Sequence, residues 1–193
     1  MKKVSVSPSN DYCPQTLFLY GTYKEDGSPN FGLFCWFSYL WLDDQMGVMA
    51  AIGGDKLTKE RILQTGVFSA NLVTEELLPL ADYLGIINGY NADKMNISLE
   101  TEHGEKLAVP ILTQSPVSFE LKVREHHVLN GSDVFLCEVF NTLVSTDVML
   151  AKTPQEKYQL LQTFAPVSTT NASYYSFDGR FLGEWGSLLC KIK

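Results

Sequence analysis

The chain has 193 residues, of which 45% are hydrophobic and 19% are charged, and its formal net charge is −7. This length and composition suffice to bury one substantial core, so we expect a single domain over residues 1–193. The acidic balance leaves no basic face that could neutralise phosphates along a nucleic acid, so nucleic acid is excluded as an expected partner.

Neither a membrane segment nor an export signal is expected. The longest apolar stretch, residues 31–42, is shorter than a bilayer span and aromatic in character. Residues 1–11 carry two lysines but lack the apolar core of a secretory signal, so the default expectation is a cytoplasmic protein. The cysteines are scattered without a C-x-x-C pair, which predicts reduced thiols. They are Cys13, Cys35, Cys137 and Cys190.

Two apolar stretches open the most informative part of the chain. Residues 31–42 (FGLFCWFSYLWL) and 46–52 (MGVMAAI) are rich in aromatic and medium-sized apolar residues, and turn formers bound both. Such runs are typical of buried strands, so each is predicted to form a strand. The pair Gly53-Gly54 then ends the pattern.

A short helix is predicted next, over residues 59–65. Thr58 precedes it as a good N-cap, and Gly66 follows at the position where a left-handed conformation is favoured. Residues 67–73 (VFSANLV) resume the apolar pattern and predict another strand.

The start of this helix suits an anion. A helix N-terminus presents unpaired N–H groups and partial positive charge, and Thr58 adds a hydroxyl. Three cations, Lys56, Lys59 and Arg61, lie nearby in sequence. Together these groups favour a phosphate. The alternative is that Thr58 is only a cap and that the cations form a solvated face.

The rest of the chain predicts an antiparallel, strand-rich fold. Residues 78–84 form a helix with a proline in its first turn, and residues 88–91 (NGYN) form a turn. Strands are predicted over residues 117–123 and 134–144, and Asn130-Gly131 between them is a strong hairpin signal.

Two further segments close the chain. Thr153-Pro154-Gln155-Glu156 is a capping box that predicts a helix to about residue 163. Residues 172–182 carry four aromatic side chains and predict a final strand or arm, in which such residues more often pack than bind ligands.

The motifs that are missing also constrain function. The sequence has no G-x-S-x-G, no P-loop and no G-x-G-x-x-G, so hydrolysis, P-loop chemistry and a Rossmann cofactor site lose support. His126 and His127 are adjacent, and neighbours in a strand point to opposite faces, so we expect no metal site there. No acid–base or nucleophilic constellation identifies a catalytic residue.

Three runs occur in an ordered series: GTYKEDGSPNFGLFCWFSYLW, MAAIGGDKLTKERILQTGVFSANLVTEELLPLADYLG and GYNADK. This series resembles the flavin reductase-like FMN-binding split-barrel family, and particularly its flavoredoxin-like branch. The resemblance covers roughly residues 12–140. It implies a mainly β fold, an antiparallel Greek-key split β-barrel with a few short helices, and FMN as the cofactor.

The resemblance also implies a set of cofactor contacts on the barrel strands and at the phosphate end. Those along the flavin are Asn30, Trp36, Phe37 and Ser38, those in the bordering strand are Ser69 and Asn71, and those at the phosphate are Thr58 and Lys94.

Two positions depart from the family pattern. Many relatives have Gly-Asp-His before a late strand, where this chain has Ser132-Asp133-Val134, so the histidine contact is absent. Many also have a double proline between the first two barrel strands. This chain has Leu42-Asp43-Asp44-Gln45 there, so the shape of that loop does not carry over.

By this resemblance the protein is an oxidoreductase that passes electrons from NADH, NADPH or another donor through FMN to an acceptor. The acceptor would be a small molecule, such as free flavin or ferric iron, or a redox protein. Because the cofactor carries the redox chemistry, the protein needs no acid–base constellation. The alternatives are a non-catalytic flavin-binding electron carrier and a split barrel that binds another phosphate ligand, such as pyridoxal phosphate.

A homodimer with flavin sites near its interface is the expected assembly, partly from the resemblance and partly from the excess of aromatic residues. Residues 174–185 would form an arm over the neighbour's flavin. The alternative is a monomer whose aromatic residues fill the barrel core.

Overall fold

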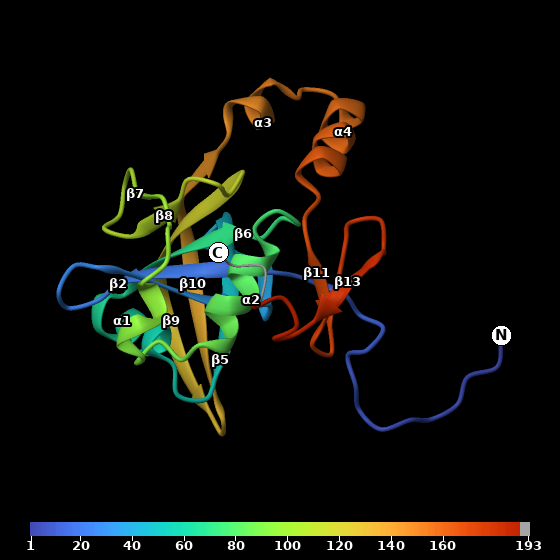
Figure 1. The fold of residues 1–193 in the computed structure, drawn as a ribbon, viewed down its shortest axis with the longest axis horizontal. Coiled ribbons are helices and arrows are strands. Elements are labelled where there is room, and N and C mark those ends of the chain that lie inside the picture. The colour runs from blue at the N-terminus through green and yellow to red at the C-terminus, as the bar shows by residue number, and fades with distance from the viewer. Residues whose placement is uncertain (190–193) are drawn as a thin grey trace.

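A seven-stranded antiparallel sheet dominates the computed structural model, which describes residues 1–189 (Figure 1). The strands lie in the order β3-β2-β6-β9-β10-β5-β4. Their bounds are β2 Phe18–Tyr23, β3 Pro29–Phe34, β4 Phe37–Leu42, β5 Gln45–Gly53, β6 Val67–Leu72, β9 Val117–Leu129 and β10 Ser132–Val144. The mainly β, antiparallel architecture is as predicted.

Two small sheets and a few short helices surround the large sheet. The sheet strands are β1 Gln15–Thr16, β11 Ser168–Thr170, β12 Ser173–Tyr175 and β13 Phe181–Glu184 in one sheet, and β7 Thr101–His103 and β8 Pro110–Leu112 in the other. The helices are α1 Leu57–Thr65, α2 Leu78–Ile86, the 3₁₀ helix η1 Ala92–Met95, α3 Thr146–Leu150 and α4 Pro154–Phe164. Within residues 1–189 no helix is both long and apolar enough to cross a membrane.

The large sheet curls into a barrel that does not close. Its two edge strands, β3 and β4, follow each other in sequence and are joined by a corner at Cys35-Trp36. There the Phe37 N–H donates to the Cys35 carbonyl at 2.9 Å, and the Ala51 N–H donates to the Trp36 carbonyl at 2.9 Å. Because β3 and β4 do not pair, the barrel is split between them, as predicted. The prediction of one strand over residues 31–42 is wrong, because a continuous apolar run does not show where the chain turns.

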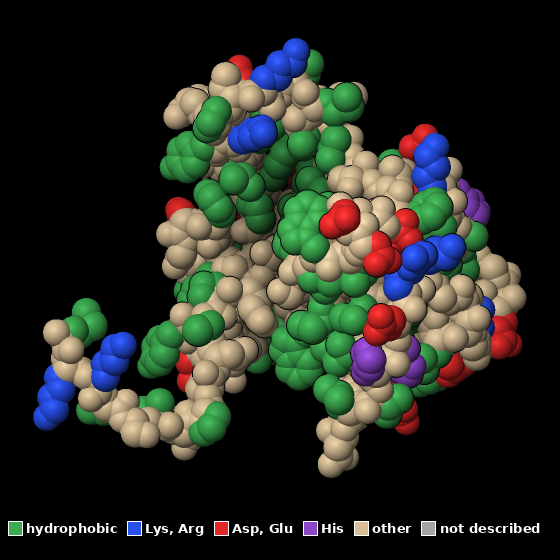
Figure 2. Space-filling view, turned by 180° about the vertical axis from the view of Figure 1, so that it is seen from behind, with side chains coloured by type: hydrophobic (Ala, Val, Ile, Leu, Met, Phe, Trp, Pro, Cys, Tyr) green, Lys and Arg blue, Asp and Glu red, His purple; other side chains and the backbone are tan. Residues whose placement is uncertain are grey.

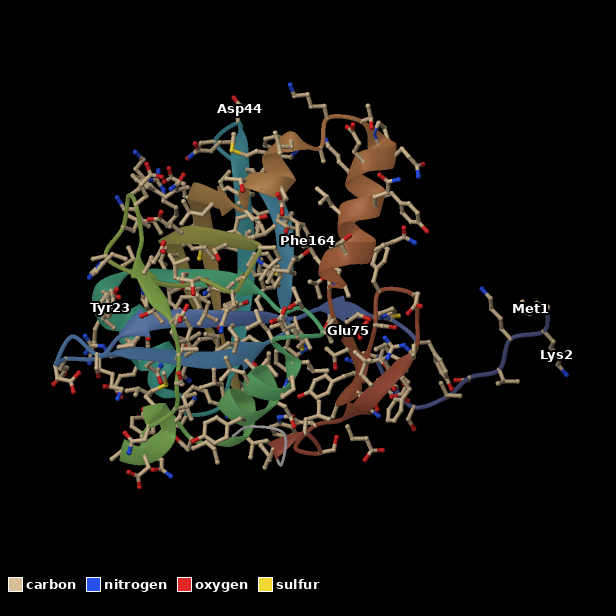
Figure 3. All side chains as sticks on the ribbon, turned by 45° about the horizontal axis from the view of Figure 1, so that its top comes forward. Met1, Lys2, Tyr23, Asp44, Glu75 and Phe164 are labelled. Atoms are coloured by element: carbon tan, nitrogen blue, oxygen red, sulfur yellow. The ribbon has the colours of Figure 1, made fainter. Side chains whose placement is uncertain are left out.

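The β4–β5 and β9–β10 hairpins of the large sheet have left-handed residues in their turns. Gly131 has φ 94° in the tight turn between β9 and β10, which confirms the predicted hairpin. Strand β9 is longer than predicted because residues 124–129 are exposed and begin with four polar side chains, which give no apolar signal. Strand β10 begins two residues earlier than predicted, at the polar residues Ser132 and Asp133. The β4–β5 turn consists of Asp43 and Asp44, with φ 47° and 64°. Figure 3 shows Asp44 at the tip of this turn.

Helix α1 begins at Leu57, two residues earlier than an N-cap at Thr58 would require. Lys56 is the N-cap and makes no side-chain cap bond, so the prediction that Thr58 caps the helix is wrong. Thr58 lies in the first turn of α1, where the buried Asn30 side-chain amide donates a hydrogen bond to its hydroxyl oxygen. Gly66 does end the helix in the left-handed conformation, with φ 71°. Helix α4 has the predicted capping box between Thr153 and Glu156.

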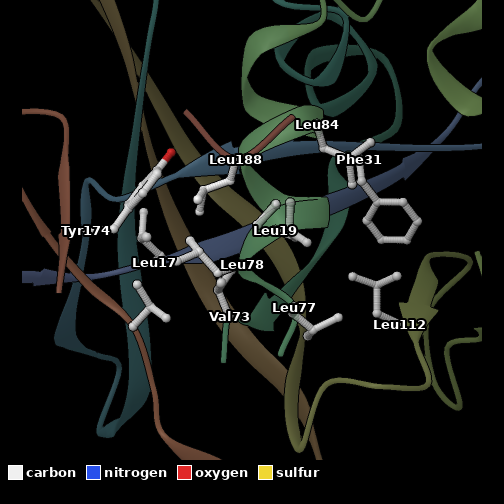
Figure 4. Packing of buried hydrophobic residues seen from close by; sticks show 12 residues of the cluster. Leu17, Leu19, Phe31, Val73, Leu77, Leu78, Leu84, Leu112, Tyr174 and Leu188 are labelled. Atoms are coloured by element: carbon white, nitrogen blue, oxygen red, sulfur yellow. The ribbon is translucent and has the colours of Figure 1, made fainter. Parts of the chain in front are cut away.

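Two apolar clusters hold the fold together. One fills the barrel, with Tyr20, Phe68 and Phe135 among its buried members. The other lies between the sheet and α2 and includes residues from the C-terminal part of the chain (Figure 4). Strands β12 and β13 of that part form a short hairpin, where one strand or arm was predicted over residues 172–182. The second cluster therefore attaches the chain's last elements to one side of the barrel.

Candidate functional site

The site is built where α1 begins beside β3 and the segment before η1. A small hollow there is lined by Thr58, Lys56 and Lys94 together with Gly32 and Gly89. A Cβ on Gly32 would lie 3.0 Å from the Thr58 hydroxyl oxygen and 2.9 Å from the Phe34 ring. A Cβ on Gly89 would lie 2.7 Å from the Leu57 Cβ. The two glycines therefore let the walls of the hollow approach each other closely.

Thr58 is oriented by a side chain beneath it. The Asn30 Nδ2 group donates to Thr58 Oγ1 at 3.0 Å and faces Thr22 Oγ1 at 3.4 Å. Asn30 is fully buried, and its Oδ1 has no partner within the described residues. Since the Thr58 oxygen already accepts a bond, its hydroxyl proton is available to donate to a ligand. Asn30 thus positions Thr58 and has no exposed surface of its own.

Lys94 brings a buried positive charge to the same hollow. It lies in η1, which Asn91 caps by accepting from the Asp93 N–H at 2.9 Å. Within residues 1–189 no carboxylate pairs with the Lys94 amine. Burial, reinforced by the charges of Lys56 and Lys24, lowers the pKa of Lys94 to about 8. A cation held in this way attracts an anion that can enter the hollow.

Two of the cations predicted at this helix are engaged elsewhere. Lys59 Nζ lies 2.8 Å from Asp133 Oδ2, and the Arg61 Nε donates to the Tyr23 carbonyl at 2.9 Å. The other carboxylate oxygen, Asp133 Oδ1, lies 2.7 Å from His126 Nε2. Lys59 first, and then His126, lowers the pKa of Asp133. Lys56 and Lys94 are therefore the two cations that line the hollow.

A larger hollow of about 510 Å³ adjoins the small one. The two share the lining residues Leu33, Phe34, Lys56 and Gly85. Trp36 lines the larger hollow from the barrel corner, and Tyr174 and Trp185 line it from the C-terminal part of the chain. Its volume and its aromatic walls suit a flat aromatic ligand whose anionic end lies at Thr58 and Lys94.

The structure does not bring the other sequence-predicted residues to this hollow. Phe37 packs on Phe18, with ring centroids 4.4 Å apart, and lines a separate hollow, while Ser38 is exposed on β4. Ser69 and Asn71 are fully buried. The Ser69 hydroxyl donates to the Pro110 carbonyl at 2.5 Å, and Asn71 Nδ2 donates to the Leu19 carbonyl at 2.9 Å. Cofactor contacts by these four residues stay predictions.

Sequence reasoning missed the walls that come from distant parts of the chain. Gly32 and Gly89 could have been found only from the close approach of β3, α1 and the segment before η1. Tyr174 and Trp185 are the ends of the arm that the sequence predicts over residues 174–185. No local pattern indicates that this arm folds back on the hollow of its own chain.

A model of the family described as the flavin reductase like domain matches residues 10–160. The chain belongs to this flavin reductase-like family. Its split barrel is similar to the flavoredoxin of Methanosarcina acetivorans, with 18% identity, a TM-score of 0.78 and coverage of 97% of both chains. It is also similar to the flavoredoxin of Desulfovibrio vulgaris (Miyazaki F), with 23% identity, a TM-score of 0.76 and coverage of 96% of this chain and 98% of that chain.

A third similar structure is an FMN-binding protein from Thermus thermophilus. It is 21% identical, with a TM-score of 0.67 and coverage of 95% of this chain and 93% of that chain. A comparison with curated protein sequences finds no significant match. At these identities the likeness to solved structures establishes the fold, and membership of the flavin reductase-like family rests on the matched domain.

The buried charge of Lys94 predicts a pH-dependent stability. Its pKa is about 8 in the folded chain and 10.5 for an ordinary lysine, so below about pH 8 the folded state carries the full cost of the buried charge. Lys94→Met should therefore stabilise the ligand-free protein at pH 7 by on the order of 1–3 kcal/mol. This gain should shrink as the pH rises from 8 towards 10.5, as measured by urea unfolding across that range.

Lys56→Met is the matched control, because Lys56 lines the same hollow but is exposed. It removes only the charge of Lys56, which is a smaller cause of the lowered Lys94 pKa than burial, so its effect at pH 7 should be well below that of Lys94→Met. A gain for Lys94→Met that did not change with pH would mean that packing, and not charge, causes it.

Proposed function

We propose that this protein is an FMN-dependent oxidoreductase of the flavin reductase and flavoredoxin type. One observation carries the proposal: within residues 1–189 the buried Lys94 amine has no carboxylate partner, and it lies with the Thr58 hydroxyl beside an aromatic-walled hollow of about 510 Å³. FMN has one terminal phosphate and one flat ring system. The flavin reductase-like family and the similarity to flavoredoxins and an FMN-binding protein support the same cofactor.

The residues divide the work of binding between the two hollows. Thr58 would donate its hydroxyl proton to the phosphate, and Lys94 would neutralise one of its charges. Trp36 and Leu33 would contact the ring system and exclude water from one side. When bound, FMN supplies the electron transfer itself, from NADH, NADPH or another donor to a small-molecule or protein acceptor. The chain's own part is to bind, orient and shield.

The phosphate assignment predicts a selective loss of affinity. Thr58→Ala removes a hydrogen bond to a charged group, which is worth on the order of 1.5–3 kcal/mol, so FMN affinity should fall roughly tenfold to a hundredfold. Riboflavin lacks the phosphate, so its affinity should not change. Thr58→Ser keeps the hydroxyl and should bind FMN nearly as the unmodified chain does. Fluorescence titration of each variant with both flavins measures these values.

If Thr58→Ala lowered the affinities for FMN and riboflavin equally, Thr58 would not bind the phosphate. An unmodified chain that binds neither flavin would contradict the proposed function itself.

Anaerobic mixing with reduced nicotinamide distinguishes an enzyme from a carrier. If the protein accepts electrons from NADH or NADPH, the visible absorbance of its bound FMN should disappear rapidly, and an added acceptor should restore it. The control is free FMN at the same concentration with the same nicotinamide. Bound FMN that is reduced no faster than free FMN would favour the non-catalytic electron carrier.

The apolar surface of the barrel supports a homodimer as part of this proposal. Trp41 and Tyr39 on the edge strand β4 are 77% and 57% exposed. Near the same end of the barrel, Leu161 and Phe177 line a further hollow of about 460 Å³ with Tyr39. Figure 2 shows hydrophobic side chains gathered both on the barrel and on the projecting α3–α4 unit. Clustered exposed apolar side chains of this kind mark protein–protein contacts, and a second copy of the chain would cover them.

Trp41→Glu tests this assembly. Light scattering of the unmodified chain should give about twice 21.6 kDa, and the variant should give a mass near 21.6 kDa because a buried glutamate would oppose association. Val128→Glu is the control, since Val128 is equally exposed at the far β9–β10 hairpin and should leave the mass unchanged. A mass near 21.6 kDa for the unmodified chain would refute the dimer.

A further inference from the structure

One wall of the larger hollow comes from a segment far from the barrel in sequence. This C-terminal arm, residues 173–189, contributes Tyr174 and Trp185. Trp185 lies against α2 at Gly85, where an added Cβ would be 3.3 Å from the indole nitrogen and 3.0 Å from Leu33 Cβ. The Trp185 indole can lie this close to α2 because Gly85 has no side chain. The arm covers the hollow of its own chain. The sequence predicts instead that it covers the flavin of a neighbouring chain.

A single buried carboxylate holds this arm. Asp82 on α2 is fully buried and accepts three hydrogen bonds, all from the arm. The donors are the Tyr174 hydroxyl at 2.8 Å, the Gly186 N–H at 2.6 Å and the Leu188 N–H at 2.9 Å. Within the described residues no lysine, arginine or histidine pairs with Asp82. The arm therefore supplies the polar partners that make the burial of this carboxylate tolerable.

The three hydrogen bonds to Asp82 attach the arm to α2 and also fix the arm's position. Tyr174 and Leu188 also pack in the apolar cluster with Leu78 and Leu84 of α2 (Figure 4). Apolar packing alone is non-directional, whereas three bonds to two oxygens of one side chain set the position of the donors. One donor is the Gly186 N–H, directly after Trp185, and Gly186 has φ 81°. Because Asp82 and Gly85 are three residues apart, they lie on the same side of α2.

We propose that Asp82 is a positioning residue that latches the C-terminal arm so that Trp185 walls the cofactor hollow. Trp185 is then a ligand-contacting residue, and Asp82 acts on the ligand only through it. The ligand part of this inference rests on the proposed function, whereas the latch is a property of the ligand-free chain. Trp185 is 53% exposed, so its other side faces the solvent from which an electron donor or acceptor arrives.

The latch is tested first without any ligand, by hydrogen exchange of the Gly186 and Leu188 amides. Asp82→Asn replaces one acceptor oxygen by an N–H₂ group, which faces a donor of the arm. Exchange of the two amides should become at least about tenfold faster. Glu75→Gln is the matched control, because it makes the same carboxylate-to-amide change at the surface ion pair of the same arm, Glu75 Oε2 to Arg180 Nη2 at 2.7 Å. Glu75→Gln should leave the two amides unchanged.

The coupling to the hollow is tested with FMN. Trp185→Ala leaves the Asp82 bonds intact and should weaken FMN binding about threefold to tenfold without faster exchange at Gly186 and Leu188. Asp82→Asn should weaken FMN binding to a similar extent. The double variant should bind FMN no more weakly than Trp185→Ala alone, because both changes remove the same wall. If Asp82→Asn does not fold, Tyr174→Phe removes one donor and should give a smaller change in the same direction.

Unchanged amide exchange in Asp82→Asn would overturn the latch. Additive losses of FMN affinity in the double variant would overturn the action through Trp185, since a merely structural role of Asp82 gives that result. A chain that binds no flavin would refute the proposed function, and the exchange of the ligand-free variants would still decide whether Asp82 latches the arm.

Discussion

The corner at Cys35-Trp36 is the constraint on which the rest of the structure depends. It takes the chain from one edge of the seven-stranded sheet to the other, so the two edges face each other without pairing. The Trp36 carbonyl binds the Ala51 N–H of β5, which fixes the corner to the barrel. The indole is left to line the larger hollow. A closed barrel would have satisfied both edges with hydrogen bonds, and it would have left no such opening beside β3.

Charge is distributed unevenly around this opening. The chain is acidic overall, yet the small hollow concentrates Lys56 and Lys94 at the N-terminal end of α1. Asp133 holds Lys59 away from the hollow, and the Tyr23 carbonyl binds Arg61. The cations of the helix therefore have two tasks. Lys59 and Arg61 attach α1 to neighbouring strands, and Lys56 and Lys94 remain for a ligand.

Much of the fold could be predicted because its signals are local. The Asn130-Gly131 turn, the left-handed Gly66 and the capping box at Thr153 depend on backbone conformations that only a few residue types favour. The corner inside residues 31–42 could not be predicted in this way, since residues 33–37 are all apolar or aromatic and include no turn former. Thr58 is chemically a good cap, but Asn30, 28 residues away, engages its hydroxyl within the first turn.

The residues of the candidate site divide in the same way, into those that the sequence predicts and those that only long-range packing determines. Thr58, Lys94 and Trp36 were predicted and do line the two hollows. The engagement of Lys59 depends on Asp133, 74 residues along the chain, and that of Asp82 on donors 92 to 106 residues away. Contacts over such separations are decided by the packing of whole elements, so a single sequence gives no pattern for them.

If the proposed function holds, the buried amine of Lys94 would link cofactor supply to the lifetime of the protein. Within the described part of the chain this charge has no carboxylate counterion, so it weakens the folded state, and a bound anion would stabilise the folded state by mass action. Newly made chains without flavin would unfold more often than loaded ones and would be the preferred substrates of cellular proteases. The abundance of the protein in a cell would then follow the concentration of its flavin, with no dedicated regulator.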